Sequence, residues 1–292
     1  MEGERVELDR AREVLESGRP ESPSERGVVQ LATAYGELST GKLPEFTLSG
    51  FERTHRRLFE GALDDAVVGR YKTVANVVTD VSETVVRFYP TPPERVRSEL
   101  TALLSWLEGP GMAGLPPVTA AIFLAEFEAI HPFLDGNGRL GRFLNVALLE
   151  RLGLRNAGLV PLDARFFRTS DHYYRALATT NTGANYQLWT RYYVRELEKA
   201  YELAGKRGDL SRTVGRFTKP STQAVLQWIL AGSGDWFHRG DYPNRPGYSG
   251  PALWSCLQEL VRADLLEERG AGKGREYRVK SGFLAEAYGR LA

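Results

Sequence analysis

The 292-residue sequence has little cysteine, no long apolar run and almost no net charge. Its single cysteine, Cys256, excludes an internal disulfide and a zinc site of several cysteines, and its apolar surroundings predict a core residue. No apolar run reaches the roughly 18 residues that a membrane-spanning helix needs, so we expect no membrane partner. The first residues lack the apolar stretch of a secretory signal, which favours a cytoplasmic protein. A net charge of +1 gives no overall case for nucleic acid.

What is present is the composition of a soluble globular protein, with 42% hydrophobic and 26% charged residues. The length suits one large core and a smaller module. We predict a mainly α fold in three parts: an N-terminal helical segment over residues 1–45, a helical bundle over 46–210 and a small α+β module over 216–292.

Apolar periodicity supports the bundle. Residues 92–109 carry apolar side chains at helical spacing, with Thr91 and Glu94 in the pattern of a capping box. Residues 116–130 are apolar on nearly every side, which predicts a helix buried in the bundle. Residues 140–153 carry one apolar stripe and end at a glycine. Two β-branched runs, 71–79 and 83–90, predict a small hairpin beside the bundle.

Between the two predicted core helices lies HPFLDGNGR, residues 131–139, followed by LGR. Gly136 and Gly138 lack a Cβ, so backbone N–H groups around Asn137 can converge into a nest for anionic oxygens. A helix begins here, and its positive dipole end favours phosphate. Arg139 and Arg142 lie near each other on a helical wheel, which suits more than one phosphate.

Two further side chains add chemistry to this anion site. Asp135 supplies a carboxylate of the kind that holds Mg²⁺ together with phosphate oxygens and water. His131 stands just before the nest, and an imidazole titrates near neutral pH, so it can take a proton from a hydroxyl. Singly, each residue has an ordinary alternative as a cap, a turn or a solvated surface group. Their coincidence favours phosphoryl or nucleotidyl transfer.

The stretch HPFLDGNGRLGR resembles the motif of Fic domain proteins, HxFx[DE]GNGRxxR, at every specified position. The order of FERTHRRLFEGALDDAVVGRYK, the hairpin, FYPTPPERV and the buried helix is also similar to that family, over roughly residues 46–203. The resemblance implies a Fic-type helical bundle with a hairpin flap over residues 46–210. It also implies transfer of AMP from ATP to a Ser, Thr or Tyr hydroxyl of a target protein, with release of pyrophosphate and with Mg²⁺ as cofactor.

The same resemblance implies a role for each motif residue. His131 is the base, Asp135 binds Mg²⁺ and Phe133 anchors the loop. The phosphates are bound by Gly136, Asn137, Gly138, Arg139 and Arg142, of which Arg142 holds the γ-phosphate. The flap residues Arg87, Phe88 and Tyr89 align a target backbone by strand addition.

Many Fic proteins carry an inhibitory helix with the pattern [ST]xxxE[GN]. Thr33 and Glu37 have this spacing, although Leu38 stands where glycine or asparagine is expected. We hypothesise that Glu37 pairs with Arg142 and keeps the resting enzyme weakly active. The alternative is that Glu37 lies on a solvated helix face.

The module from residue 216 onward resembles a winged helix-turn-helix, with helices over residues 221–232 and 250–268 and two strands around a glycine-rich turn within residues 265–279. It has eleven basic and eight acidic residues. The helix that would correspond to a recognition helix starts near Ser249 and presents Trp254, Ser255 and Gln258 rather than a row of arginines, so it offers few contacts for DNA phosphates and bases. We favour an interaction or homodimer role over DNA binding.

Three functional classes stay open at this point. The first is a protein adenylyltransferase that modifies a target protein or itself. The second is a relative that transfers another nucleotide or a phosphoryl group. The third is a non-enzymatic regulator that senses nucleotide.

Overall fold

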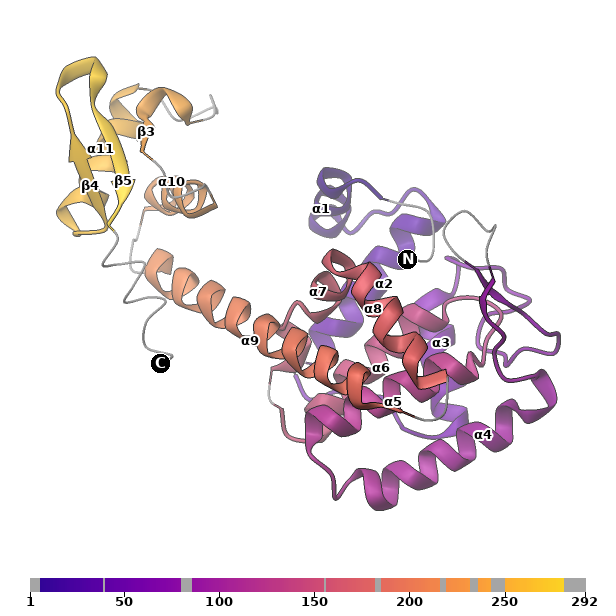
Figure 1. The fold of residues 1–292 in the computed structure, drawn as a ribbon. Coiled ribbons are helices and arrows are strands. Elements are labelled where there is room, and N and C mark those ends of the chain that lie inside the picture. Colours follow the sequence, from indigo (N-terminus) through magenta and orange to yellow (C-terminus); the bar gives the residue numbers. More distant parts are fainter. Residues whose placement is uncertain are drawn as a thin grey trace. The chain divides into compact units, whose positions relative to one another are not determined.

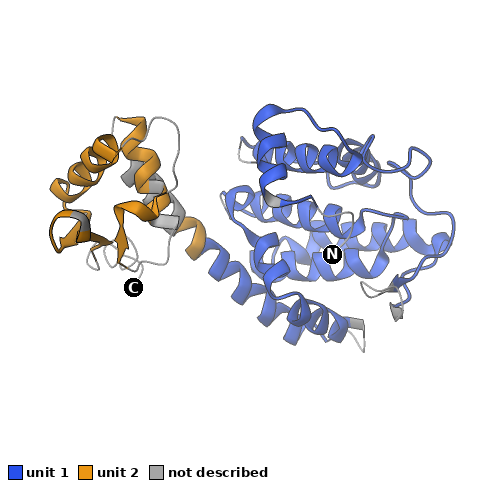
Figure 2. Cartoon of the chain, turned by 90° about the horizontal axis from the view of Figure 1, so that it is seen from above, with its two compact units in different colours: residues 1–201 blue, residues 202–292 orange. Residues whose placement is uncertain are grey.

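The computed structural model describes residues 6–38, 40–79, 86–154, 156–181, 185–215, 219–231, 236–242 and 250–280. The chain divides into two compact units, residues 1–201 and 202–292, which are coloured separately in Figure 2. No helix among the described residues is both long and apolar enough to span a membrane.

The first unit is mainly helical, as the sequence predicts. Its helices are α1 (Leu8–Ser17), α2 (Pro23–Leu38), α3 (Leu48–Phe59), α4 (Pro93–Trp106), α5 (Pro116–Ile130), α6 (Asn137–Arg151), α7 (Leu162–Arg168), α8 (Ser170–Ala178) and α9 (Gln187–Gly215), whose end belongs to the second unit. Shorter turns are η1 (Leu107–Gly111), η2 (Ala157–Leu159) and η3 (Thr179–Asn181).

Helices α5 and α6 lie side by side at the centre of this unit (Figure 1). The predicted buried helix over residues 116–130 is confirmed, because α5 has buried side chains on all its faces. The structure buries α6 on more sides than the single predicted stripe, since α2 and α3 also contact it. The polypeptide between these two central helices is therefore fixed at both ends by the core.

Polar groups buried in this core are hydrogen-bonded. The Asn145 amide of α6 donates to the Ala120 carbonyl of α5 at 2.6 Å and accepts from the Tyr193 hydroxyl of α9 at 2.6 Å. The Trp189 indole N–H of α9 donates to the Ala121 carbonyl at 2.6 Å. These bonds fix α9 against the central pair, because an unpaired polar group at this depth is costly.

The predicted capping box at Thr91 is wrong. The N-cap of α4 is Pro92, and Pro93 occupies the first turn, where a missing N–H is harmless. Thr91 instead donates its backbone N–H to the Ala129 carbonyl at 3.3 Å, which links the entry of α4 to the end of α5.

The predicted hairpin is present as two short antiparallel strands, β1 (Val78–Thr79) and β2 (Val86–Phe88). Val78 pairs with Phe88 and Thr79 with Val86, with an irregularity in the register between these pairs. The tip of the hairpin, residues 80–85, lies outside the described residues.

The second unit contains helices α10 (Pro220–Ala231) and α11 (Gly250–Arg262) and a three-stranded antiparallel sheet in the order β3 (Phe237–His238), β5 (Glu276–Val279), β4 (Leu266–Arg269), with turns η4 (Arg239–Asp241) and η5 (Gly272–Gly274). Cys256 is buried in its core, as predicted. The winged-helix assignment stays a prediction.

Three arginines of the β4–β5 hairpin pair with carboxylates. Cross-strand ion pairs join Arg269 to Glu276 and Arg278 to Glu267, and Arg275 pairs with Glu268. On α11, the Trp254 side chain is exposed. The preference for an interaction role over DNA binding stays a prediction.

Replacing Tyr193 by phenylalanine tests the buried network. Tyr193→Phe leaves the Asn145 side-chain oxygen buried without its donor, so we expect the free energy of unfolding to fall by about 1–3 kcal/mol. The matched control is Tyr201→Phe on the same helix, whose hydroxyl bond to the Leu154 carbonyl is longer, 3.4 Å, and partly exposed. Chemical denaturation measures both variants; equal losses would contradict the assignment.

Candidate functional site

The loop between α5 and α6 begins and ends with left-handed backbone. His131 ends α5 with φ 50° and ψ 61°, while its N–H donates to the Phe127 carbonyl at 2.9 Å. Gly136 has φ 76° and caps the start of α6. The sequence therefore places a histidine at one edge of the loop and the N–H groups of a new helix at the other.

Asn137 holds this loop from inside. Its side-chain oxygen accepts the Phe133 N–H at 2.8 Å, and its side-chain amide donates to the Phe133 carbonyl at 2.7 Å. Both side chains are fully buried. The side chain of Asn137 therefore shapes the loop, and the phosphate contact at this position stays a prediction.

His55 of α3 supports the same loop and was not singled out from the sequence. Its ring stacks on Phe133 with 4.0 Å between centroids and 17° between planes. Its Nδ1 accepts the Gly69 N–H at 2.9 Å, so its Nε2 carries the hydrogen and donates to the Asp135 carbonyl at 3.0 Å. The available signal was the position of His55 on the apolar face of the FERTHRRLF helix, which indicates a core histidine rather than a catalytic one.

Lys72 fixes the end of α5. It is 4% exposed, its N–H donates to the Pro132 carbonyl at 2.9 Å, and its amine donates to Asn76 and to the Ile130 carbonyl. Burial lowers the pKa of the Lys72 amine to about 8. The amine therefore satisfies a carbonyl at a helix end, immediately before His131.

His131 lies between the flap and α5. Its ring meets Phe88 of β2 edge to face, with 6.1 Å between centroids. Its Nδ1 is 4.0 Å from a carboxylate oxygen of Glu128, a nearly buried residue on the last turn of α5. Of the predicted flap residues, Phe88 thus reaches the histidine and Tyr89 is exposed, whereas the side chain of Arg87 lies outside the described part of the chain.

Asp135 and Arg139 stand at the start of α6. One Asp135 oxygen accepts the Gly136 N–H at 2.5 Å and is 3.4 Å from the Arg139 guanidinium, which also lies over the Phe59 ring. The Asp135 side chain is about half exposed. Within the described residues, no three His, Cys, Asp or Glu side chains gather to hold a metal alone. A single accessible carboxylate fits Mg²⁺ whose other ligands are phosphate oxygens and water.

The predicted pairing of Glu37 with Arg142 is corrected by the structure. Glu37 pairs with Arg57 and, at 3.1 Å, with Lys42. Both partners lower the pKa of the Glu37 carboxyl. Arg142 has its Nε 3.5 Å from an Asp163 oxygen.

The reason for this difference is helical phase. Tyr35 faces α7, where its hydroxyl bonds to Asp163, and Glu37 is turned by about 200° from it around α2. Leu38, which departs from the family pattern, is a buried core residue.

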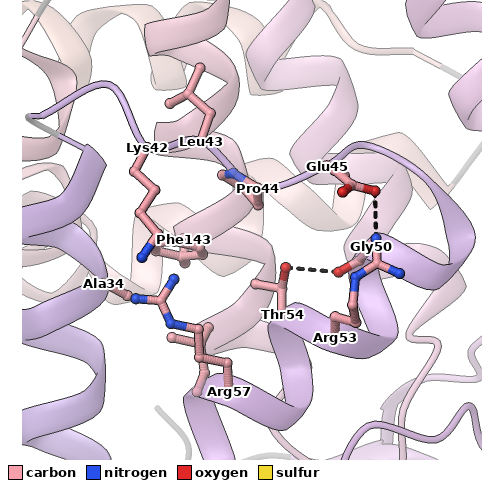
Figure 3. Close-up of a pocket in the computed structure, with 11 residues that line it drawn as sticks. Ala34, Lys42, Leu43, Pro44, Glu45, Gly50, Arg53, Thr54, Arg57 and Phe143 are labelled. Carbon is pink, nitrogen blue, oxygen red and sulfur yellow. Dashed lines mark hydrogen bonds and ion pairs between the residues drawn. The ribbon is translucent and has the colours of Figure 1, made fainter.

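The partners of Glu37 line a cavity of about 300 Å³ between α2, α3 and α6. In Figure 3 the Lys42 amine and the Arg57 guanidinium point toward one another beside Phe143, while Arg53 reaches Glu45. None of the predicted motif residues lines this cavity. It is therefore separate from the loop that carries His131.

The region around this loop matches a known protein family. The Fic/DOC family model matches residues 45–149. Protein adenylyltransferase fic-1 of Caenorhabditis elegans is 28% identical over 211 residues, which are 69% of this chain and 39% of that protein. Protein adenylyltransferase Fic of Nematostella vectensis is 32% identical over 143 residues, 49% of this chain and 30% of that protein. The chain thus spans less than half the length of these curated relatives.

Solved structures show the same fold. A Fic family protein from Desulfovibrio desulfuricans G20 superposes with a TM-score of 0.61 at 21% identity, over 94% of this chain and 82% of that one. Fic-1 of C. elegans, residues 134–508, superposes with a TM-score of 0.52 at 25% identity, over 68% of this chain and 57% of that one. These likenesses confirm the predicted mainly α fold.

Gly136→Ala tests the tight entry to α6. An added Cβ at Gly136 would lie 2.9 Å from the Phe59 ring, in backbone that already has positive φ. We expect the free energy of unfolding to fall by about 2–4 kcal/mol, from overpacking and strain together. Gly153→Ala is the control, because φ is also positive there but no atom lies within 4 Å of the new Cβ. Equal losses in chemical denaturation would show that the Phe59 contact is unimportant.

Proposed function

We propose, since the chain carries a Fic/DOC family domain over residues 45–149, that it is a protein adenylyltransferase. It would transfer AMP from ATP to a hydroxyl of a target protein and release pyrophosphate. The observation that carries this proposal is His131, held at the end of α5 within one short loop of the N-terminus of α6.

The start of α6 supports phosphate binding. Its N–H groups and positive dipole end favour an anion, and the positive φ of Gly136 turns the backbone into the helix there. Arg139 and Arg142 come from the first turns of the same helix, so both add positive charge beside the phosphates.

His131 supplies the base. Its imidazole accepts the proton of the target hydroxyl, the hydroxyl oxygen forms a bond to the α-phosphorus of ATP, and the bond from that phosphorus to the β-phosphate oxygen breaks. Pyrophosphate leaves with the bonding electrons. General-base help of this kind is worth about 10²–10⁴ in rate. Asp135 would hold Mg²⁺, which when bound neutralises phosphate charge.

The flap supports the choice of a polypeptide as acceptor. Strand β2 contacts His131 through Phe88, and the adjoining Tyr89 is 78% exposed. An extended target segment that adds to this strand would bring its hydroxyl side chain toward the imidazole. The target can be another protein or a second copy of this chain.

Replacing the base is the decisive test. We expect His131→Ala to lower AMP transfer by at least about a hundredfold while ATP binding stays near the parent value, because the phosphate contacts come from α6. Intact mass after incubation with ATP and Mg²⁺ measures self-modification as a gain of one AMP, and calorimetry measures binding. Undiminished transfer by His131→Ala would refute the mechanism.

A second variant tests whether Glu37 restrains the enzyme. Because Glu37 pairs with Arg57 and Lys42 rather than with Arg142, we expect Glu37→Gly to transfer AMP at the parent rate and to lose only a little stability. Lys42→Ala breaks one of these pairs but leaves Glu37 in place, so it is the control. Faster transfer by Glu37→Gly, with Lys42→Ala unchanged, would contradict this expectation and show that Glu37 restrains the enzyme.

A further inference from the structure

We infer that Asp163 and Tyr35 form a positioning pair for Arg142, which holds this guanidinium ready for the terminal phosphate of ATP. The inference rests on the proposed function, because it assigns the pair to the nucleotide site. Neither residue belongs to the HPFLDGNGRLGR motif, and they come from helices on opposite sides of it in the sequence.

The geometry joins three helices through one carboxylate. Arg142 of α6 has a side chain only 11% exposed, and its Nε lies 3.5 Å from one oxygen of Asp163, in the first turn of α7. The other Asp163 oxygen accepts the Tyr35 hydroxyl of α2 at 2.8 Å. Each oxygen of Asp163 thus faces a different helix, so the carboxylate cannot turn toward one without weakening its contact with the other.

Tyr35 and Asp163 are themselves fixed. The Tyr35 ring packs edge to face on Phe143, the residue after Arg142, with 5.5 Å between centroids. Desolvation, followed by the Asp163 charge, raises the pKa of the Tyr35 hydroxyl well above its usual value, so it stays a donor. Leu162, beside Asp163, is 1% exposed and anchors the start of α7 in the core.

The Asp163 carboxylate is suited to position Arg142 rather than to compete with ATP for it. A nearly buried guanidinium needs a counterion, since an uncompensated charge in such surroundings is strongly destabilising. At 3.5 Å the Arg142 contact is longer than a normal charge-assisted hydrogen bond, and it involves the Nε edge. Because Asp163 is also bonded to Tyr35, it can orient Arg142 from this distance. It does not form the short bidentate pair that a mobile carboxylate would form.

The test compares nucleotides with and without the terminal phosphate, in the full chain. Asp163→Asn removes the charge but keeps an oxygen for Tyr35, and Tyr35→Phe removes the hydroxyl but keeps the ring on Phe143. We expect the Kd for ATP to rise about tenfold in Asp163→Asn and about threefold in Tyr35→Phe, with the Kd for AMP unchanged in both. Calorimetry with each nucleotide measures the four values.

Asp171→Asn is the matched control, because it makes the same change of charge at an exposed position on α8. A merely structural role would weaken ATP and AMP binding alike, and that result would overturn the inference. So would ATP binding that is unchanged or tighter in Asp163→Asn, the latter meaning that the carboxylate competes with phosphate. A parent chain that binds no ATP would instead contradict the proposed function, and this inference with it.

Discussion

The two hydrogen bonds between the Asn137 side chain and the Phe133 backbone are the constraint on which the site depends. The chain must leave α5, reverse and begin α6 within a few residues, and unsatisfied backbone groups in such a turn would be costly. Asn137 satisfies both backbone groups of Phe133 from inside the loop. The backbone then enters α6 in a fixed conformation, and His131 is held at the opposite edge of the loop.

This loop keeps its shape because distant segments support it. His55 of α3 stacks on Phe133 and bonds to the Asp135 carbonyl, while Lys72 bonds to the carbonyls of Ile130 and Pro132. Both support residues are buried, polar and hydrogen-bonded, which is the condition under which burial of such groups is stable. A site whose backbone is fixed in this way can bind phosphate without first ordering a loop, and that lowers the entropy lost on binding.

The sequence predicted the parts of the site that are local. Glycine conformation, the helix start and the spacing of His131, Asp135 and Arg139 all follow from neighbouring residues, so the motif and the core helices beside it could be placed without coordinates. His55 and Lys72 could not be identified this way, because their partners are distant in the chain. The pairing of Glu37 failed for a related reason: its spacing from Thr33 is a property of one helix, whereas its partner depends on which face of α2 meets α3 and which meets α7.

The ion pairs of the first unit range widely in length. Arg165 binds Glu196 at 2.6 Å, whereas Arg12 lies 3.6 Å from Asp9. The contacts of the two motif arginines fall toward the long end of this range, 3.4 Å from Arg139 to Asp135 and 3.5 Å from Arg142 to Asp163. A cation in a short bidentate pair has to lose that pair before it can bind phosphate. A cation held at longer range is compensated in the empty site and can still gain a closer anionic partner. Under the proposed function, contacts of this length would compensate Arg139 and Arg142 without nucleotide and still let each gain a closer phosphate partner.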